Sequence, residues 1–394
     1  MVVRALALVA LTAVPALAPR AAVAASAAAT RGVTATKVTV GGLLSADPAD
    51  AGADLGARAR FARAGRIAGR TIVYAGAASA ADAGAVTQLT NTAFAVVPVV
   101  ADGTSSAAVL ARATVPFVGI AGEPDWRANR FGFGVTGSGV GPRGREVNPA
   151  WGTQLRALLG GARGKTVAIV TDNSSFALPT ANARVPRPPT LEDAGFAVSA
   201  PLVVPNPVSP ADVANAATTL MTQNPAVVLV LTTPATVGAL ARELAARGYT
   251  GTVGAQDALY LPQAPAFGSG LTILTTIAPL ESDTAALRRM TADVHAVDAN
   301  ATVTPAVARG YFAADFFVRV LARAGRRLTP QRFLEVANRS GFSYAVTATV
   351  GASTWPAMHA RAISCGALVQ GDGTGYVVIE PYRCVADVTR KPKR

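Results

Sequence analysis

Short apolar runs rich in β-branched residues recur along the chain, and each opens into a polar loop. The clearest two are Lys37 to Ser45 and Gly164 to Phe176. Continuous apolar character over so few residues is typical of a buried parallel strand, because both faces of such a strand are covered. Since the two runs have the same form, we predict that one α/β unit begins at Lys37 and a second at Lys165.

The order of elements also repeats. In the first half, the apolar runs Asn91 to Val100 and Val115 to Ala121 flank a helical segment, and in the second half Asn224 to Leu231 and Tyr249 to Ala255 do the same. Strands that alternate with helices form βαβ units in parallel sheets, and ligands bind at the carboxyl ends of those strands. The predicted fold class is α/β, with two doubly wound parallel-sheet lobes around one cleft.

The pattern after Ile277 extends neither repeat. It is helical over Thr284 to Val297, Ala306 to Ala324 and Pro330 to Asn338, with Thr329 as N-cap of the last helix, and it is β-rich afterwards. The chain is therefore expected to recross between lobes through a multi-crossing hinge. The predicted organisation is a first lobe of residues 36–155 joined by 281–339, and a second lobe of residues 156–280 joined by 340–394.

Two segments contain many turn-forming residues. Asn129 to Asn148 is Gly-rich and is predicted as a connecting loop. Its Gly139 to Gly144 matches the dinucleotide fingerprint literally, but Pro142 lies within the turn and no acidic residue follows at the required spacing, so no cofactor is expected. In the apolar run Phe196 to Val204, Pro201 indicates a strand at a sheet edge.

The N-terminus has the features of a secretory signal peptide over residues 1–25. Arg4 precedes an apolar run, Pro15 ends it, and small residues follow at Ala22 to Ala24. No later apolar stretch approaches the roughly 18 residues that span a bilayer, so no stable membrane insertion is expected after cleavage. The mature chain is predicted to be secreted or associated with the cell envelope.

The two cysteines, Cys365 and Cys384, flank a turn-rich segment predicted to form a β-hairpin. If residues pair across that turn, the cysteines face each other. Because an exported chain meets oxidising conditions, we predict a disulfide at the base of the hairpin, with two free buried thiols as the alternative.

The charge and the chemistry-bearing residues exclude several functions. The net charge of +13 raises the question of nucleic acid, but no aromatic residues are interleaved among the basic ones for base stacking, so a nucleic-acid partner is not expected. His295 and His359 lack metal-ligand spacing to a second His or Cys. No nucleophile elbow or Walker loop is present, and an enzyme is not predicted.

Candidate ligand-binding residues follow the predicted strands. Ser45 ends the first strand, and Thr232 and Asp257 follow two strands of the second half. A carboxylate at Asp257 that faced a closed cleft would pair with a ligand ammonium, although a solvated loop acid is the alternative. Phe176 is either a wall for an apolar ligand part or a core residue.

A second candidate lies in the first half. Thr104, Ser105 and Ser106 offer hydroxyls and backbone amides at a predicted helix start. The helix dipole and unpaired N–H groups there favour an anion such as a carboxylate, and an ordinary N-cap is the alternative.

The order of these elements resembles the periplasmic branched-chain amino-acid-binding proteins of ABC importers, which have the type I periplasmic-binding fold. The resemblance extends from about Lys37 to the C-terminus. The segments that carry it are Lys37 to Ser45, Ile67 to Arg70, Thr104 to Ser106, Val167 to Phe176, Val227 to Gly248 and Gly254 to Asp257.

The resemblance implies a two-lobed protein of the Venus flytrap kind that closes on a small solute and presents it to a membrane permease. It implies that the loops matched by Thr104 to Ser106 and by Gly119 to Glu123, Gly122 included, hold an amino acid's carboxylate. It also implies that Asp257 takes the ammonium and that an aromatic near Phe176 covers the ligand. Glu123 departs from this pattern, because it puts a negative charge where a carboxylate would lie.

These observations predict a secreted solute-binding protein for a small amphipathic molecule, such as an amino acid or amide, with an ABC permease as partner. Two alternatives stay open. One is a ligand-sensing or scavenging module of the same fold without transport. The other is a secreted α/β enzyme, which the lack of a catalytic constellation disfavours.

Overall fold

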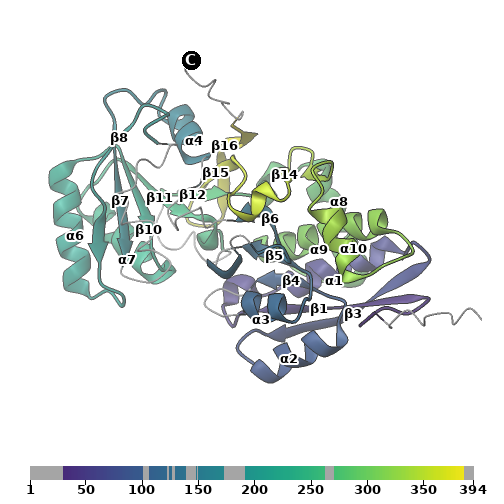
Figure 1. The fold of residues 1–394 in the computed structure, drawn as a ribbon. Coiled ribbons are helices and arrows are strands. Elements are labelled where there is room, and N and C mark those ends of the chain that lie inside the picture. Colours follow the sequence, from purple (N-terminus) through teal and green to yellow (C-terminus); the bar gives the residue numbers. More distant parts are fainter. Residues whose placement is uncertain are drawn as a thin grey trace, which may run out of the picture.

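The computed structural model describes residues 30–100, 106–121, 124–126, 129–138, 148, 150–172, 191–261 and 270–385, and the predicted signal peptide lies outside them. The chain forms two lobes side by side, with its C-terminal segment between them (Figure 1). Each lobe is built on a large sheet whose central strands are parallel. This confirms the predicted α/β class with two doubly wound lobes.

The first sheet has the strand order β2-β3-β1-β4-β5-β6. Strand β4 is buried along its whole length because helices cover both faces of the sheet. The elements of this part of the chain are β1 (Lys37–Leu44), η1 (Pro48–Asp50), α1 (Ala53–Ala64), β2 (Arg66–Ile67), β3 (Arg70–Ser79), α2 (Ala83–Thr92), β4 (Ala95–Val100), α3 (Ser106–Arg112), β5 (Phe117–Ala121), η2 (Pro124–Trp126) and β6 (Gly132–Ser138).

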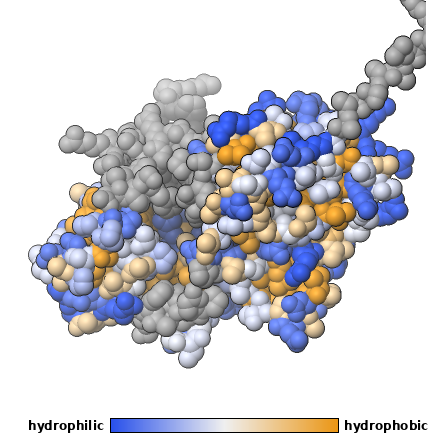
Figure 2. Space-filling model, turned by 90° about the horizontal axis from the view of Figure 1, so that it is seen from below, coloured by the Kyte–Doolittle hydropathy of each residue, from blue (hydrophilic) through white to orange (hydrophobic). Residues whose placement is uncertain are grey.

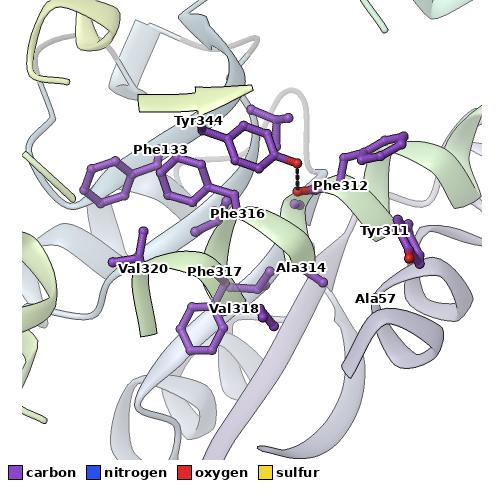
Figure 3. Close-up of a cluster of buried hydrophobic side chains, with 14 of the residues drawn as sticks. Ala57, Phe133, Tyr311, Phe312, Ala314, Phe316, Phe317, Val318, Val320 and Tyr344 are labelled. Carbon is purple, nitrogen blue, oxygen red and sulfur yellow. Dashed lines mark hydrogen bonds between the residues drawn. The ribbon is translucent and has the colours of Figure 1, made fainter. Parts of the chain in front are cut away.

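One face of the first sheet is covered by α2 and α3. The other is covered by α1 and by three helices from the last third of the chain, α8 (Ala285–Val297), α9 (Pro305–Ala324) and α10 (Pro330–Ala337). Figure 3 shows Phe316 of α9 beside Phe133 of β6, while the Phe317 ring lies further from Phe133. Tyr344 lies over the same helix and donates its hydroxyl to the Phe312 carbonyl at 3.1 Å.

The second sheet has the order β16-β15-β12-β11-β10-β7-β8, and β9 also pairs with β7. Helices α6 and α7 cover one face and α4 the other. The elements are α4 (Ala150–Leu158), β7 (Thr166–Asp172), β8 (Ala197–Val198), β9 (Leu202–Val204), α6 (Pro210–Gln223), β10 (Val227–Leu231), α7 (Pro234–Ala246), β11 (Thr252–Gln256), η3 (Asp257–Leu259), β12 (Leu271–Thr275), β15 (Cys365–Gly371) and β16 (Tyr376–Cys384). The predicted edge strand Phe196 to Val204 is thus two short edge strands.

The chain passes between the sheets after β6, after β12 and after Ile363. The last passage runs beside the end of β6, where the Ser138 backbone N–H donates to the Arg361 carbonyl at 3.0 Å and the Ile363 N–H donates to the Thr136 carbonyl at 2.9 Å. Gly137 has a φ of 79° at this point, and a Cβ on it would overlap the Arg361 carbonyl. The predicted multi-crossing hinge is therefore present, and its close approach requires glycine.

One predicted loop contains a strand. Residues 132–138 of the Gly-rich segment Asn129 to Asn148 form β6, which is buried throughout. Two of its glycines have neighbours too close for a side chain, because a Cβ on Gly132 would overlap the Phe117 ring and one on Gly134 would overlap the Gly137 carbonyl. Glycine content, which usually marks a loop, here marks a tightly covered strand.

The segment after residue 340 also differs from the prediction, which joined it to the second lobe. Strands β13 (Ser343–Val346) and β14 (Val350–Thr354) form their own small sheet. Phe342, Trp355 and Ile363 belong to the hydrophobic cluster of the first sheet. The chain enters the second sheet only at Cys365. The prediction was wrong here because a β-rich pattern does not reveal which sheet a strand packs against.

The C-terminal hairpin forms as predicted. Cys365 faces Cys384 across β15 and β16 and is joined to it by a disulfide, with Cα atoms 3.9 Å apart. Gly351 of β14 lies against the disulfide, and its N–H donates to the Tyr382 hydroxyl at 2.8 Å. Tyr382 in turn donates to the Thr276 carbonyl at 3.1 Å. The base of the hairpin is therefore held where the two lobes meet.

Thr329 caps α10 as predicted, because its side chain accepts the Arg332 N–H. Among the described helices, none combines the length and apolar character needed to cross a bilayer. On the face shown in Figure 2, hydrophobic residues are scattered among hydrophilic ones on both lobes.

Candidate functional site

Asp257 lies at the junction of the lobes. It follows β11 at the carboxyl edge of the second sheet and begins η3. Its carboxylate accepts the Thr276 hydroxyl at 2.6 Å, and its backbone carbonyl accepts a hydrogen bond of 2.6 Å from Arg309. Because Arg309 belongs to α9, which packs on the first sheet, this second bond joins the two lobes.

Arg309 also connects to the end of the first strand. Its guanidinium lies 3.7 Å from a carboxylate oxygen of Asp50, whose other oxygen accepts the Ser45 hydroxyl at 2.5 Å. Arg309 and Asp50 are both buried. Burial raises the pKa of Asp50 above its ordinary value, while the Ser45 hydrogen bond and the Arg309 charge oppose that rise.

The close contact of α1 with α9 fixes this arrangement. A Cβ on Gly56 would overlap the backbone of Val307, and a Cβ on Gly310 would overlap that of Ala53. Two glycines therefore let the helix backbones touch. That contact sets Arg309 beside the η1 segment that carries Asp50.

Tyr260 and Glu281 form a second link at the same junction. The Tyr260 hydroxyl donates to the Glu281 carboxylate and accepts the Leu280 N–H at 3.0 Å. Burial is the main cause that raises the Tyr260 pKa, and the nearby Glu281 charge adds to it. This tyrosine therefore stays neutral and acts as a hydrogen-bonding group.

The cavity beside Asp257 is small. It has a volume of about 20 Å³ and is bounded by Asp257, Tyr260, Thr276, Pro305 and Arg309, among others. That is room for about one water molecule. In the part of the chain that the structure describes, these residues therefore enclose a space too small for a whole solute.

Of the predicted site residues, Ser45 and Asp257 are brought together through Asp50 and Arg309. Ser106 begins α3 and is buried. Thr232 follows β10 and donates its hydroxyl to the Thr233 carbonyl at 3.4 Å. The predicted residues outside the described part of the chain are Thr104, Ser105, Gly122, Glu123 and Phe176.

No motif or predicted strand end in the sequence marks Asp50 or Arg309 as a site residue. A signal for Arg309 exists, because it is a lone charge in a helix whose neighbours Ala306 to Phe312 are otherwise apolar or small. A charge on such a buried face requires a partner. Asp50 lies in a loop rich in Asp, Gly and Pro, where nothing distinguishes it from Asp47.

Comparison with solved structures shows the fold. A fatty acid ABC transporter substrate-binding protein from Thermomonospora curvata matches with a TM-score of 0.68 and 16% identity, covering 90% of this chain and 94% of that one. A leucine binding protein from Thermotoga maritima matches with a TM-score of 0.65 and 15% identity, covering 88% and 98%. A solute binding protein from R. palustris in complex with benzoate matches with a TM-score of 0.61 and 15% identity, covering 89% and 97%.

Sequence comparison gives the family. No curated protein matches the chain. The family model described as periplasmic binding protein matches residues 32–375, which is most of the chain. The chain therefore belongs to the periplasmic binding protein family and has the type I fold of its leucine/isoleucine/valine-binding members.

Proposed function

We propose that this chain is a secreted solute-binding protein that closes its lobes on a small amphipathic molecule and delivers it to an ABC importer. The observation that carries the proposal is the hydrogen bond from Arg309 to Asp257, which joins the lobes at the carboxyl ends of their strands. Ligands of open α/β sheets bind at that edge. A group bound there contacts both lobes and favours the closed state.

The solute class follows from the groups at the junction. The Asp257 carboxylate uses one hydrogen bond with Thr276 and has further lone pairs for a ligand ammonium or amide N–H. Fatty acid, leucine and benzoate, which are named for three structural neighbours, each join a carboxylate to an apolar body. We expect an amino acid, an amide or a similar molecule for this chain.

A thermal-shift screen of amino acids, amides and aromatic acids against the mature chain tests the proposal. A solute that binds only the folded state raises stability by about 2.7 kcal/mol at a hundredfold excess over its Kd. For the best solute, Asp257→Asn is expected to weaken binding about thirtyfold, the equivalent of one hydrogen bond to a charged group.

Glu192→Gln is the matched control, because Glu192 is an exposed acid of the same lobe. It should bind the solute with unchanged affinity. A screen without any stabilising solute would contradict the proposed function, whereas an unchanged affinity in Asp257→Asn would contradict only the role of that residue. Uptake of the labelled solute by cells lacking the gene should fall; if uptake stays the same, the protein senses or scavenges rather than transports.

A further inference from the structure

A second pocket lies on the first lobe, away from Asp257. It has a volume of about 580 Å³, within the range of small-molecule sites. Its walls come from α10, from the short helix η6 (Ala357–His359) and from the chain before β6. It shares no lining residue with the cavity at Asp257. The residues around it are Arg130, Gln331, Leu334, Glu335, Asn338, Arg339, Pro356, His359 and Ala360.

The floor of this pocket is buried and uncharged. Leu334 is 3% exposed and His359 is 6% exposed. Asn338 donates its amide N–H groups to the carbonyls of Arg130 and Leu334, at 3.2 and 3.1 Å, so its side-chain oxygen must accept the His359 Nε2–H at 2.5 Å. Burial lowers the pKa of His359 to about 4, and the ring is neutral at pH 7.

The rim carries positive charge. Arg130 lies 5.6 Å from the Phe131 ring centroid, which helps to hold its guanidinium in place, and Arg339 is exposed. Within the described part of the chain, neither arginine is paired with a carboxylate. Glu335 is already engaged, because its oxygens accept from Gln331 at 3.3 Å and from Arg332 at 3.5 Å. Two arginine charges are therefore available above a neutral, partly apolar floor.

We propose that this pocket is a second binding site, for a small organic anion with an apolar body. The carboxylate of such a ligand pairs with Arg130 and Arg339, since guanidinium groups match carboxylates in geometry and charge. The apolar body lies on Leu334 and Pro356. The site is independent of the inter-lobe site, because its lining comes from the first lobe alone.

The chain offers a direct probe, because it contains only two histidines. With ¹³C-labelled histidine, the ring signal of His359 reports on the pocket floor, and His295 on the exposed face of α8 is the internal control. Titration with 1-naphthoate should shift the His359 signal in a saturable way and leave His295 unmoved. The uncharged 1-naphthamide should shift neither signal. If naphthoate gives no saturable shift of His359, the pocket is not a binding site for such anions.

Three substitutions test whether the charges of Arg130 and Arg339 bind the ligand's carboxylate. Arg130→Gln and Arg339→Gln should each weaken naphthoate binding about fivefold, as expected for one partly exposed charge contact. Arg326→Gln, which removes an equally exposed charge outside the pocket, should leave the Kd unchanged. Equal weakening by all three would mean attraction to overall charge and would overturn the proposal.

Two further variants separate this site from the others. Glu335→Gln removes the one acidic side chain of the pocket lining and should tighten naphthoate binding. Asp257→Asn should leave the His359 titration unchanged. If Asp257→Asn abolished the shift, the His359 signal would be reporting closure of the lobes, and the second site would be wrong while the proposed function would stand.

Discussion

The two lobes share one architecture but have different cores. The first is aromatic: Phe133 stacks on Phe316 with ring centroids 5.5 Å apart and meets Trp355 edge-on at 5.2 Å. The cluster of the second sheet with α6 and α7 is mainly aliphatic, with residues such as Val230 and Leu240. The aromatic rings come largely from segments that return late in the chain. The segments that the chain adds to the first βαβ sheet late in the sequence therefore make its core aromatic.

The lobes also differ in buried charge. In the first, Arg60 pairs with Asp315 at 2.7 Å, and Asp315 also accepts the Tyr344 hydroxyl at 3.2 Å. In the second, the pair Arg247 with Glu243 at 2.7 Å is about one-third exposed. Buried pairs tolerate the loss of one partner poorly, whereas exposed pairs contribute little. The comparison predicts that removing one partner of an ion pair has a larger effect in the first lobe than in the second.

The largest difference is expected in the cores. Phe316→Ala should lower the free energy of unfolding by about 4 kcal/mol, because it removes a fully buried ring between Phe133 and Tyr344. Val230→Ala in the second sheet should lower it by about 2 kcal/mol, since it removes two methyl groups and leaves a small cavity. Urea unfolding followed by circular dichroism measures both. Equal losses would contradict the expectation, because they would mean that the buried ring of Phe316 contributes no more than two methyl groups of Val230.

Acid should weaken the first lobe, which contains the buried His359. Burial holds the pKa of His359 at about 4, below its ordinary 6.5. Between these two pH values the histidine is protonated in the unfolded chain and neutral in the folded chain. The free energy of unfolding is therefore unaffected by this group above pH 6.5, and it decreases by about 3 kcal/mol as the pH falls towards 4.

Unfolding measured from pH 7 to pH 4 tests this expectation. His359→Gln should show a shallower loss than the unsubstituted chain, and His295→Gln at an exposed position should behave like the unsubstituted chain. Hydrogen exchange should show the acid-induced opening first around α10 and β6. Opening of the second sheet first would contradict this assignment.

The smallest expected effects concern ion pairs. Arg60→Ala should lower the free energy of unfolding by about 2 kcal/mol, because Asp315 loses one partner but keeps Arg319 and Tyr344. Arg247→Ala should lower it by about 0.5 kcal/mol, as is usual for an exposed pair. In a thermal unfolding series, increasing salt should reduce the stability difference caused by Arg247→Ala more than the difference caused by Arg60→Ala.

The repeated βαβ pattern was enough to predict the two sheets, because short, continuous β-branched runs such as Val227 to Leu231 are typical of buried parallel strands. Strand β6 escaped prediction because its glycines are explained only by neighbours distant in the sequence or by local backbone, such as the Phe117 ring at Gly132 and the Arg361 carbonyl at Gly137. The position of 342–363 on the first lobe escaped because long-range packing decides it.

At the candidate site, the residues at the strand ends could be predicted from the sequence, but the residues that they contact could not. Ser45 and Asp257 follow apolar runs, so their place at the sheet edges could be predicted. Arg309, which lies 52 residues after Asp257 in the chain, reaches the Asp257 carbonyl from a helix that two glycines allow to pack closely on α1. No local pattern encodes such a meeting.

The return of α9 to the first sheet has a consequence for synthesis. A nascent chain that has reached Ser138 already contains every strand of that sheet, yet the helix that covers Phe94 and Phe133 lies more than 160 residues ahead. Until that helix emerges, these rings have no cover and can associate with other chains. Neither lobe is continuous in the sequence, so the unfinished polypeptide exposes part of its apolar surface until its last third is made.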